Sequence, residues 1–61
     1  MSEMLRIWKG EGYNKNAQLQ LWMKNDFTTH YIFIDRLGRT AGNPTEEEAQ
    51  EIIKRWHLIE A

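Results

Sequence analysis

The spacing of apolar residues changes once along this chain, and that change restricts the fold more than any other feature. Up to residue 35, apolar and polar side chains largely alternate, which is typical of β-strands. From residue 45, apolar side chains recur every three or four residues, as on one side of a helix. The sequence therefore predicts an α+β fold, with a small antiparallel sheet packed on one C-terminal helix.

The first part of the chain predicts three strands, with a short fourth strand as a further candidate. Glycine, asparagine and aspartate residues separate these segments and are typical of turns. In "DRLGR", Asp35 and Gly38 favour a tight hairpin that leads into the fourth strand. The predicted strands cover residues 4–9, 17–24 and 28–35, with residues 39–41 as the fourth.

The helix is predicted over residues 45–57. Thr45, followed three residues later by Glu48, is the pattern of a capping box, in which the two residues satisfy each other's backbone N–H groups. The apolar stripe behind this cap consists of Ala49, Ile52, Ile53 and Trp56. A helix with one apolar side is expected to cover one face of the sheet.

Residues 1–61 are predicted to form a single domain with a small core. The chain has no cysteine and two histidines, so we expect no disulfide, no metal site and no cofactor. Self-association or close packing of its seven aromatic side chains then has to supply stability. The first residues contain no signal peptide or membrane span, so a cytoplasmic location is expected.

The face of the sheet away from the helix is the predicted binding surface. We expect Leu5, Ile7, Leu19, Leu21, Met23, Ile32 and Ile34 to face the helix. The uncovered face then carries the predicted partner-binding residues Arg6, Trp8, Gln20, Trp22, Lys24, Tyr31 and Phe33. Aromatic side chains mixed with arginine are typical of binding hot spots, and a large exposed apolar patch usually marks an interaction site.

That assignment depends on the turn near Asn25. A turn of two or four residues keeps Ile32 and Ile34 on the helix side, whereas a turn of three residues places Tyr31 and Phe33 there instead. In either register, the aromatic face has three possible covers: the loop "GEGYNKNA", a second copy of the chain, or a different partner.

Catalysis is not predicted. Ser2, the only serine, lies at the start of the chain, and no set of nucleophile, base and orienting group is visible. The acidic residues 46–48 point in different directions on a helix, and they complement the positive end of its dipole. We therefore expect a protein that is not an enzyme.

Three strands followed by a helix that begins "TEEEA" resemble the AP2-type DNA-binding domain and the related arm-binding domain of phage-type integrases. The matching residues are Thr45, Glu46, Glu47, Glu48 and Ala49. The resemblance implies DNA contact through the sheet, with Arg6, Trp8, Trp22 and Lys24 at the contact positions. The chain departs from these usually basic domains in its net charge of −1, and we do not assign it to them.

The function predicted from the sequence is stoichiometric binding of a protein through the aromatic face. A phage-encoded inhibitor or adaptor of host machinery is an example of such a protein. The first alternative is nucleic-acid binding by the same face, with Arg6 and Lys24 on phosphates and tryptophans stacked on bases. The second is an obligate homodimer whose functional surface is the acidic side of the helix at Glu47, Glu51 and Arg55.

Overall fold

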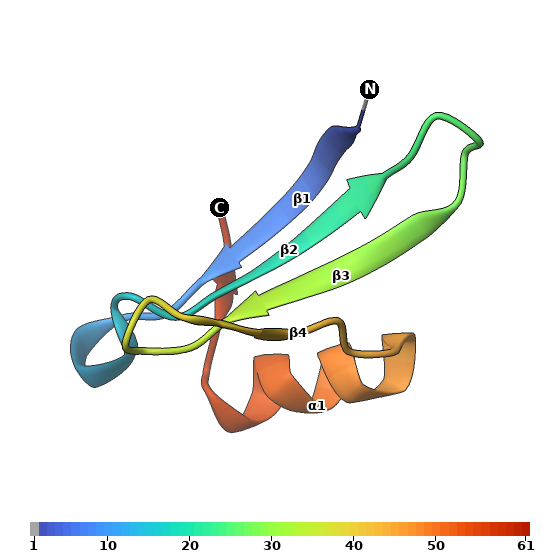
Figure 1. Ribbon diagram of the computed structural model, residues 1–61. Coiled ribbons are helices and arrows are strands. Elements are labelled where there is room, and N and C mark those ends of the chain that lie inside the picture. The colour runs from blue at the N-terminus through green and yellow to red at the C-terminus, as the bar shows by residue number, and fades with distance from the viewer. Residues whose placement is uncertain (1) are drawn as a thin grey trace.

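A computed structural model describes residues 2–61, which form two layers, a five-stranded antiparallel sheet and one α-helix. The sheet has the order β4-β3-β2-β1-β5, and the helix α1 (Glu46–Arg55) lies against one of its faces (Figure 1). The strands are β1 (Glu3–Lys9), β2 (Gln18–Met23), β3 (Thr29–Ile34), β4 (Thr40–Gly42) and β5 (Ile59–Glu60). The predicted fold class is confirmed; β5 was not predicted.

Local hydrogen bonds define both ends of α1. At its start, the Thr45 hydroxyl accepts from the backbone N–H of Glu48, and the Glu48 carboxylate accepts from the backbone N–H of Thr45. At its end, the N–H of Leu58 donates to the carbonyl of Ile53, and His57 takes a φ of 53°. This pattern is a Schellman motif. It turns the chain back so that Leu58 is buried and β5 reaches the edge of β1.

The turn between β2 and β3 determines which side of β3 meets the helix. The N–H of Lys24 donates to the carbonyl of Thr28, which leaves a turn of three residues. Leu21 is therefore opposite Tyr31, and Leu19 is opposite Phe33. The expectation that Ile32 and Ile34 face the helix is wrong, and the three-residue alternative is the observed one.

The connection between β1 and β2 reverses the predicted faces of β1. Its eight residues, 10–17, are closed by a hydrogen bond from the N–H of Gly10 to the carbonyl of Ala17, which sets Trp8 opposite Leu19. Ile7 therefore points away from the helix. A bulge at Leu5 then shifts the alternation, and this side chain is 44% exposed. The expectation that Leu5 and Ile7 lie in the core is wrong, because the pairing register, and not alternation within one strand, selects the face.

The core lies between the sheet and α1. Its buried side chains are Trp8, Ala17, Leu19, Tyr31, Phe33, Ala49 and Leu58, with Leu21, Ile52, Ile53 and Trp56 packed against them. The predicted helix stripe is thus on the core side. Aromatic rings carry much of the contact, because Trp8 lies 6.1 Å from Tyr31 and Phe33 lies 5.4 Å from Trp56 between ring centroids.

Two turns of the sheet have the same backbone arrangement but differ at the strained position. In each, three residues form the loop and the third has a positive φ, 67° at Phe27 and 81° at Gly38. Glycine tolerates this conformation, whereas a residue with a Cβ atom is strained by about 1–2 kcal/mol. The Phe27 side chain is 80% exposed, so little packing within the chain offsets the strain.

Replacing Phe27 with glycine is expected to raise the free energy of unfolding by about 0.5–1 kcal/mol, because relief of strain exceeds the extra chain entropy of glycine. The matched control is Gly38→Ala, which should lower it by about 1 kcal/mol through the backbone alone. A Cβ atom at Gly38 would have no neighbour within 4 Å. Urea unfolding measures both variants. Loss of stability in Phe27→Gly would contradict the assignment of strain.

Candidate functional site

Three of the predicted partner-binding residues are core residues. Trp8, Tyr31 and Phe33 are 6%, 8% and 8% exposed and lie on the helix side of the sheet. Their placement on the uncovered face is wrong, because both connections that flank β2 set a register opposite to the expected one.

The two predicted basic contacts also lie away from the centre of the uncovered face. Arg6 shares the face of Trp8, and its guanidinium lies 4.7 Å from the centroid of that ring. It also makes a two-point ion pair with Glu60, at 2.7 and 2.5 Å, which lowers the pKa of that carboxyl group. Lys24 follows the end of β2 and is exposed at the turn. Arg6 and Lys24 therefore do not form a joint cationic site.

Gln20 and Trp22 are the two predicted site residues that the structure places on the uncovered face. Strand pairing adds further residues to it, because directly opposite residues share a face. We call this surface the open face; among the described residues it consists of Met4, Ile7, Lys9, Gln18, Gln20, Trp22, His30, Ile32, Ile34, Thr40 and Ile59. The isoleucines were missed because their alternation alone cannot distinguish one face of a sheet from the other.

The open face is apolar and carries little charge. Its apolar side chains are Met4, Ile7, Trp22, Ile32, Ile34 and Ile59. Met4 and Ile59 are 43% and 55% exposed, and the other four are partly exposed. Of the described residues on this face, Lys9 alone carries a formal charge. None of the other elements formed by residues 2–61 covers this side of the sheet (Figure 1).

The polar groups in the middle of the open face satisfy one another. Trp22 Nε1 donates to Gln20 Oε1 at 2.9 Å, and Gln20 Nε2 donates to Gln18 Oε1 at 3.0 Å. These side chains form a short ladder along β2. A buried polar group is costly when it lacks a partner, and this ladder removes much of that cost before any other molecule arrives.

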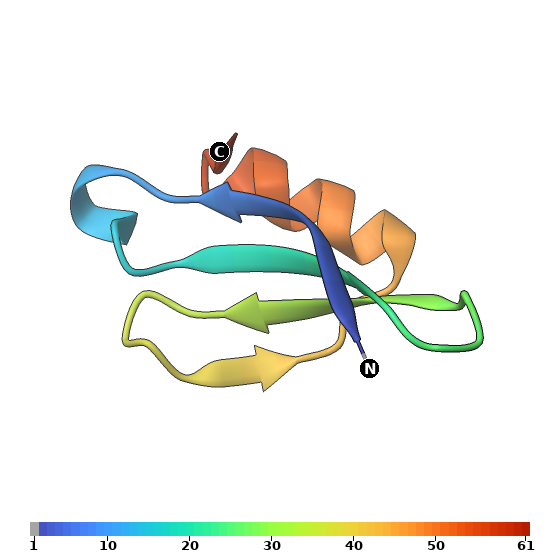
Figure 2. The ribbon, with the colours of Figure 1, turned by 90° about the horizontal axis from the view of Figure 1, so that it is seen from above.

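One end of the sheet extends beyond the helix. The β2–β3 turn projects past the start of α1 in both ribbon views, and in Figure 1 the start of β1 lies at the same far end of the sheet, away from the helix (Figures 1 and 2). Exposed apolar side chains gather along this part of the chain at Met4, Leu5 and Phe27. The strained, exposed Phe27 lies at its tip. The projecting end therefore continues the apolar character of the open face.

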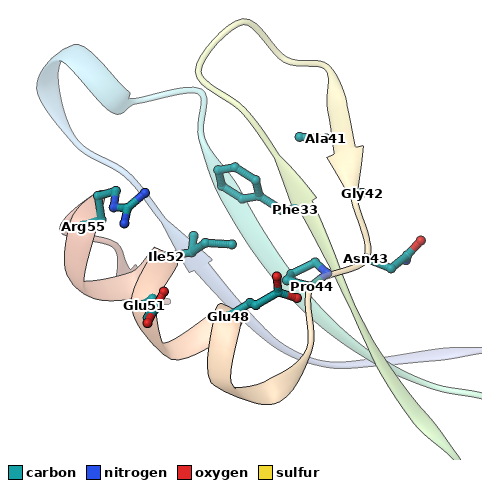
Figure 3. Close-up of a pocket in the computed structure, with 9 residues that line it drawn as sticks. All are labelled: Phe33, Ala41, Gly42, Asn43, Pro44, Glu48, Glu51, Ile52 and Arg55. Atoms are coloured by element: carbon teal, nitrogen blue, oxygen red, sulfur yellow. The ribbon is translucent and has the colours of Figure 1, made fainter.

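A groove between α1 and β4 is a second candidate site (Figure 3). Its volume is about 360 Å³, near the lower end for ligand sites, and Phe33 and Ile52 lie between its walls. Glu48 on the helix wall is already used in the capping box, and the Asn43 side chain points away from the groove and donates to the carbonyl of Tyr31. Glu51 and Arg55 of α1 also line the groove. Because Glu48 and Asn43 are already engaged within the fold, we rank the groove second to the open face.

Within residues 2–61 no group of three or more histidine or acidic side chains is placed to hold a metal ion. In the same range no helix combines the length and the apolar character needed to span a bilayer.

The acidic start of α1 has structural roles. Tyr31 donates its hydroxyl hydrogen to Glu46 at 2.7 Å, which joins the core of the sheet to the first helical turn. Burial, and then this hydrogen bond, raise the pKa of Tyr31 to about 12. The same bond lowers the pKa of Glu46, with help from Gln50.

The stability of the protein should therefore decrease in alkali through Tyr31. Its folded-state pKa of about 12 lies above the value of about 10 in an unfolded chain, so its contribution is complete below pH 10 and is lost as the pH rises through 12. Tyr31→Phe should have a lower free energy of unfolding at neutral pH, by about 1 kcal/mol for the lost hydrogen bond, but a smaller alkaline decrease.

Denaturant unfolding at increasing pH measures this effect. Tyr13→Phe is the control, because Tyr13 is 81% exposed and should leave the alkaline decrease intact. An equal decrease in Tyr31→Phe and the unmodified chain would contradict the assignment.

A comparison of the chain with protein-family models, curated proteins and solved structures finds no match.

Proposed function

We propose that this chain is a non-enzymatic module that binds a protein partner stoichiometrically through its open face. The observation that carries the proposal is an uncovered sheet face with apolar side chains around Trp22 and a self-satisfied amide ladder. Binding sites of this kind gain their free energy by removing apolar area from water. Since Gln18 Oε1, the Gln20 amide and Trp22 Nε1 already have partners, covering these atoms takes less from that gain than covering unpaired groups would.

The distribution of charge favours a protein over a nucleic acid as the partner. Contacts to phosphates supply most of the affinity for nucleic acids. Lys9 is the single formal cation among the residues that strand pairing places on the open face, and Lys24 lies beyond its end at the exposed turn. Arg6 is on the other side with Glu60 as its partner. An apolar interface should also respond little to added salt, in contrast to a phosphate contact.

The acidic helix is a weaker candidate for the binding surface. Glu46 accepts hydrogen bonds from Tyr31 and Gln50, and Glu48 caps the helix. These two carboxylates therefore already have roles within the fold. The predicted acidic surface of Glu47, Glu51 and Arg55 is exposed on α1, on the other side of the molecule from the open face.

Photo-crosslinking tests the proposed surface and captures a protein partner of any sequence. A benzophenone amino acid in place of Ile32, near the centre of the open face, should yield a protein adduct in an extract of the cells that encode the chain. The adduct should persist at high salt. The same label in place of Lys54, which is exposed on α1, is the matched control and should yield far less.

Two results would contradict the proposal. One is an Ile32 label that yields no protein adduct above the Lys54 control. The other is an Ile32 label whose adducts are nucleic acids and disappear as salt rises, which would favour the nucleic-acid alternative.

A further inference from the structure

We infer that the partner on the open face is a second copy of this chain, related to the first by a two-fold axis. This inference rests on the proposed function and names its partner. Its starting point is the thin core of one copy. Among residues 2–61, Leu19 is the one large side chain that is fully buried, and two of the seven core residues are alanines.

The exposed surface area of a single copy is also consistent with a second copy on the open face. A folded monomer of 7.3 kDa is expected to expose about 4,200 Å². This chain exposes 4523 Å². The chain thus exposes somewhat more surface than an average monomer of its mass, and a second sheet packed face to face on the open face would cover part of it.

The charges of the open face are compatible with self-association. It carries no acidic residue among its described members, and its one cation, Lys9, lies beside the edge strand β5. The acidic residues of α1 are on the opposite face and would stay in water. When a two-fold axis passes through the centre of the face, along the strands or across them, Lys9 of one copy faces a residue other than Lys9 on the second copy. The two lysines therefore do not meet.

Gln20 lies at the centre of this arrangement. It is on β2, the middle strand of the five formed by residues 2–61, and it is flanked by Ile7 and Ile32. A two-fold axis that passes between two packed sheets at this point places Gln20 opposite its own copy, whether the axis runs along the strands or across them. The ladder of Gln18, Gln20 and Trp22 keeps these polar groups paired when they are covered.

The size of the face predicts a reversible dimer. The central strands β2 and β3 have six residues each, whereas the edge strands β4 and β5 have three and two. With strands about 4.8 Å apart and a rise of about 3.3 Å per residue, the face therefore measures at most about 20 Å by 20 Å. Two such faces together present about 800 Å² before the relief of the side chains is counted, which is less than the roughly 1,200–2,000 Å² that stable specific interfaces bury and is the size of a weak interface. The dimer should therefore form and dissociate with concentration.

Charge exchange at position 20 tests the two-fold contact. Sedimentation equilibrium of the unmodified chain should show a mass rising with concentration toward twice 7.3 kDa. Gln20→Glu and Gln20→Lys should each remain monomeric, because each places two like charges together. An equimolar mixture of the two variants should recover the dimer. Glu51→Lys, on the exposed side of α1, is the control and should behave like the unmodified chain.

A single introduced cysteine gives a second test that does not add charge. Because the chain has no cysteine, Gln20→Cys offers a unique thiol. A short bis-maleimide should join two copies through this thiol, and should join Lys54→Cys poorly. This result keeps the proposal testable if a charged variant fails to fold, which circular dichroism would reveal.

Three outcomes would overturn the inference: a monomer at all concentrations, a dimer that the Gln20 charges leave unchanged, or charged variants whose mixture does not recover the dimer. A monomer combined with an Ile32 adduct to a different protein would overturn only the choice of partner. A monomer with no protein adduct at Ile32 would overturn the proposed function as well.

Discussion

The pairing of β2 with β3 is the constraint on which the rest of the structure depends. The hydrogen bond between Lys24 and Thr28 leaves three residues in the turn, and Tyr31 and Phe33 therefore share a face with Leu21 and Leu19. With this register the helix meets an aromatic face, and the isoleucines of β3 point the other way. A shift of one residue would exchange every side chain of the strand between the two faces.

The two faces of the sheet are similar in apolar content, so a further interaction has to distinguish them. The helix side has polar groups that reach the helix or the C-terminal strand: Tyr31 donates to Glu46, and Arg6 pairs with Glu60. On the open face, Trp22 donates to Gln20 and to no group on the helix. These hydrogen bonds orient α1 on one side. On the other side Gln18, Gln20 and Trp22 pair among themselves, and the buried Nδ1 of His30 has no hydrogen-bond partner among the described residues.

This arrangement links the stability of the fold to the proposed binding. A chain of 61 residues has a small core. The apolar side chains of the open face remain in contact with water in a single copy, so they add little to its stability. The strained Phe27 at the projecting end is consistent with this view, since an exposed ring in a left-handed conformation does little for the isolated chain. Strain that persists in an exposed turn is a feature often found at binding sites.

The sequence by itself determined the classes of structure in this protein. Periodicity of two and then of about 3.6 residues specified a sheet and one helix, and the Thr45–Glu48 pair specified the start of that helix. The alternation of residues 19–24 also placed Gln20 and Trp22 on one face, opposite Leu19 and Leu21. Each of these features depends on residues close in the chain, which local patterns describe well.

Only the tertiary structure decided which side chains lie on which face. Trp8, Tyr31 and Phe33 entered the core because the connections before and after β2 set the cross-strand register, and hydrogen bonds across each connection hold it. The bulge at Leu5 and the return of β5 onto β1 likewise depend on pairing between distant segments. Alternation along a strand divides its side chains between two faces. It does not indicate which face meets the helix, because contacts between strands determine that.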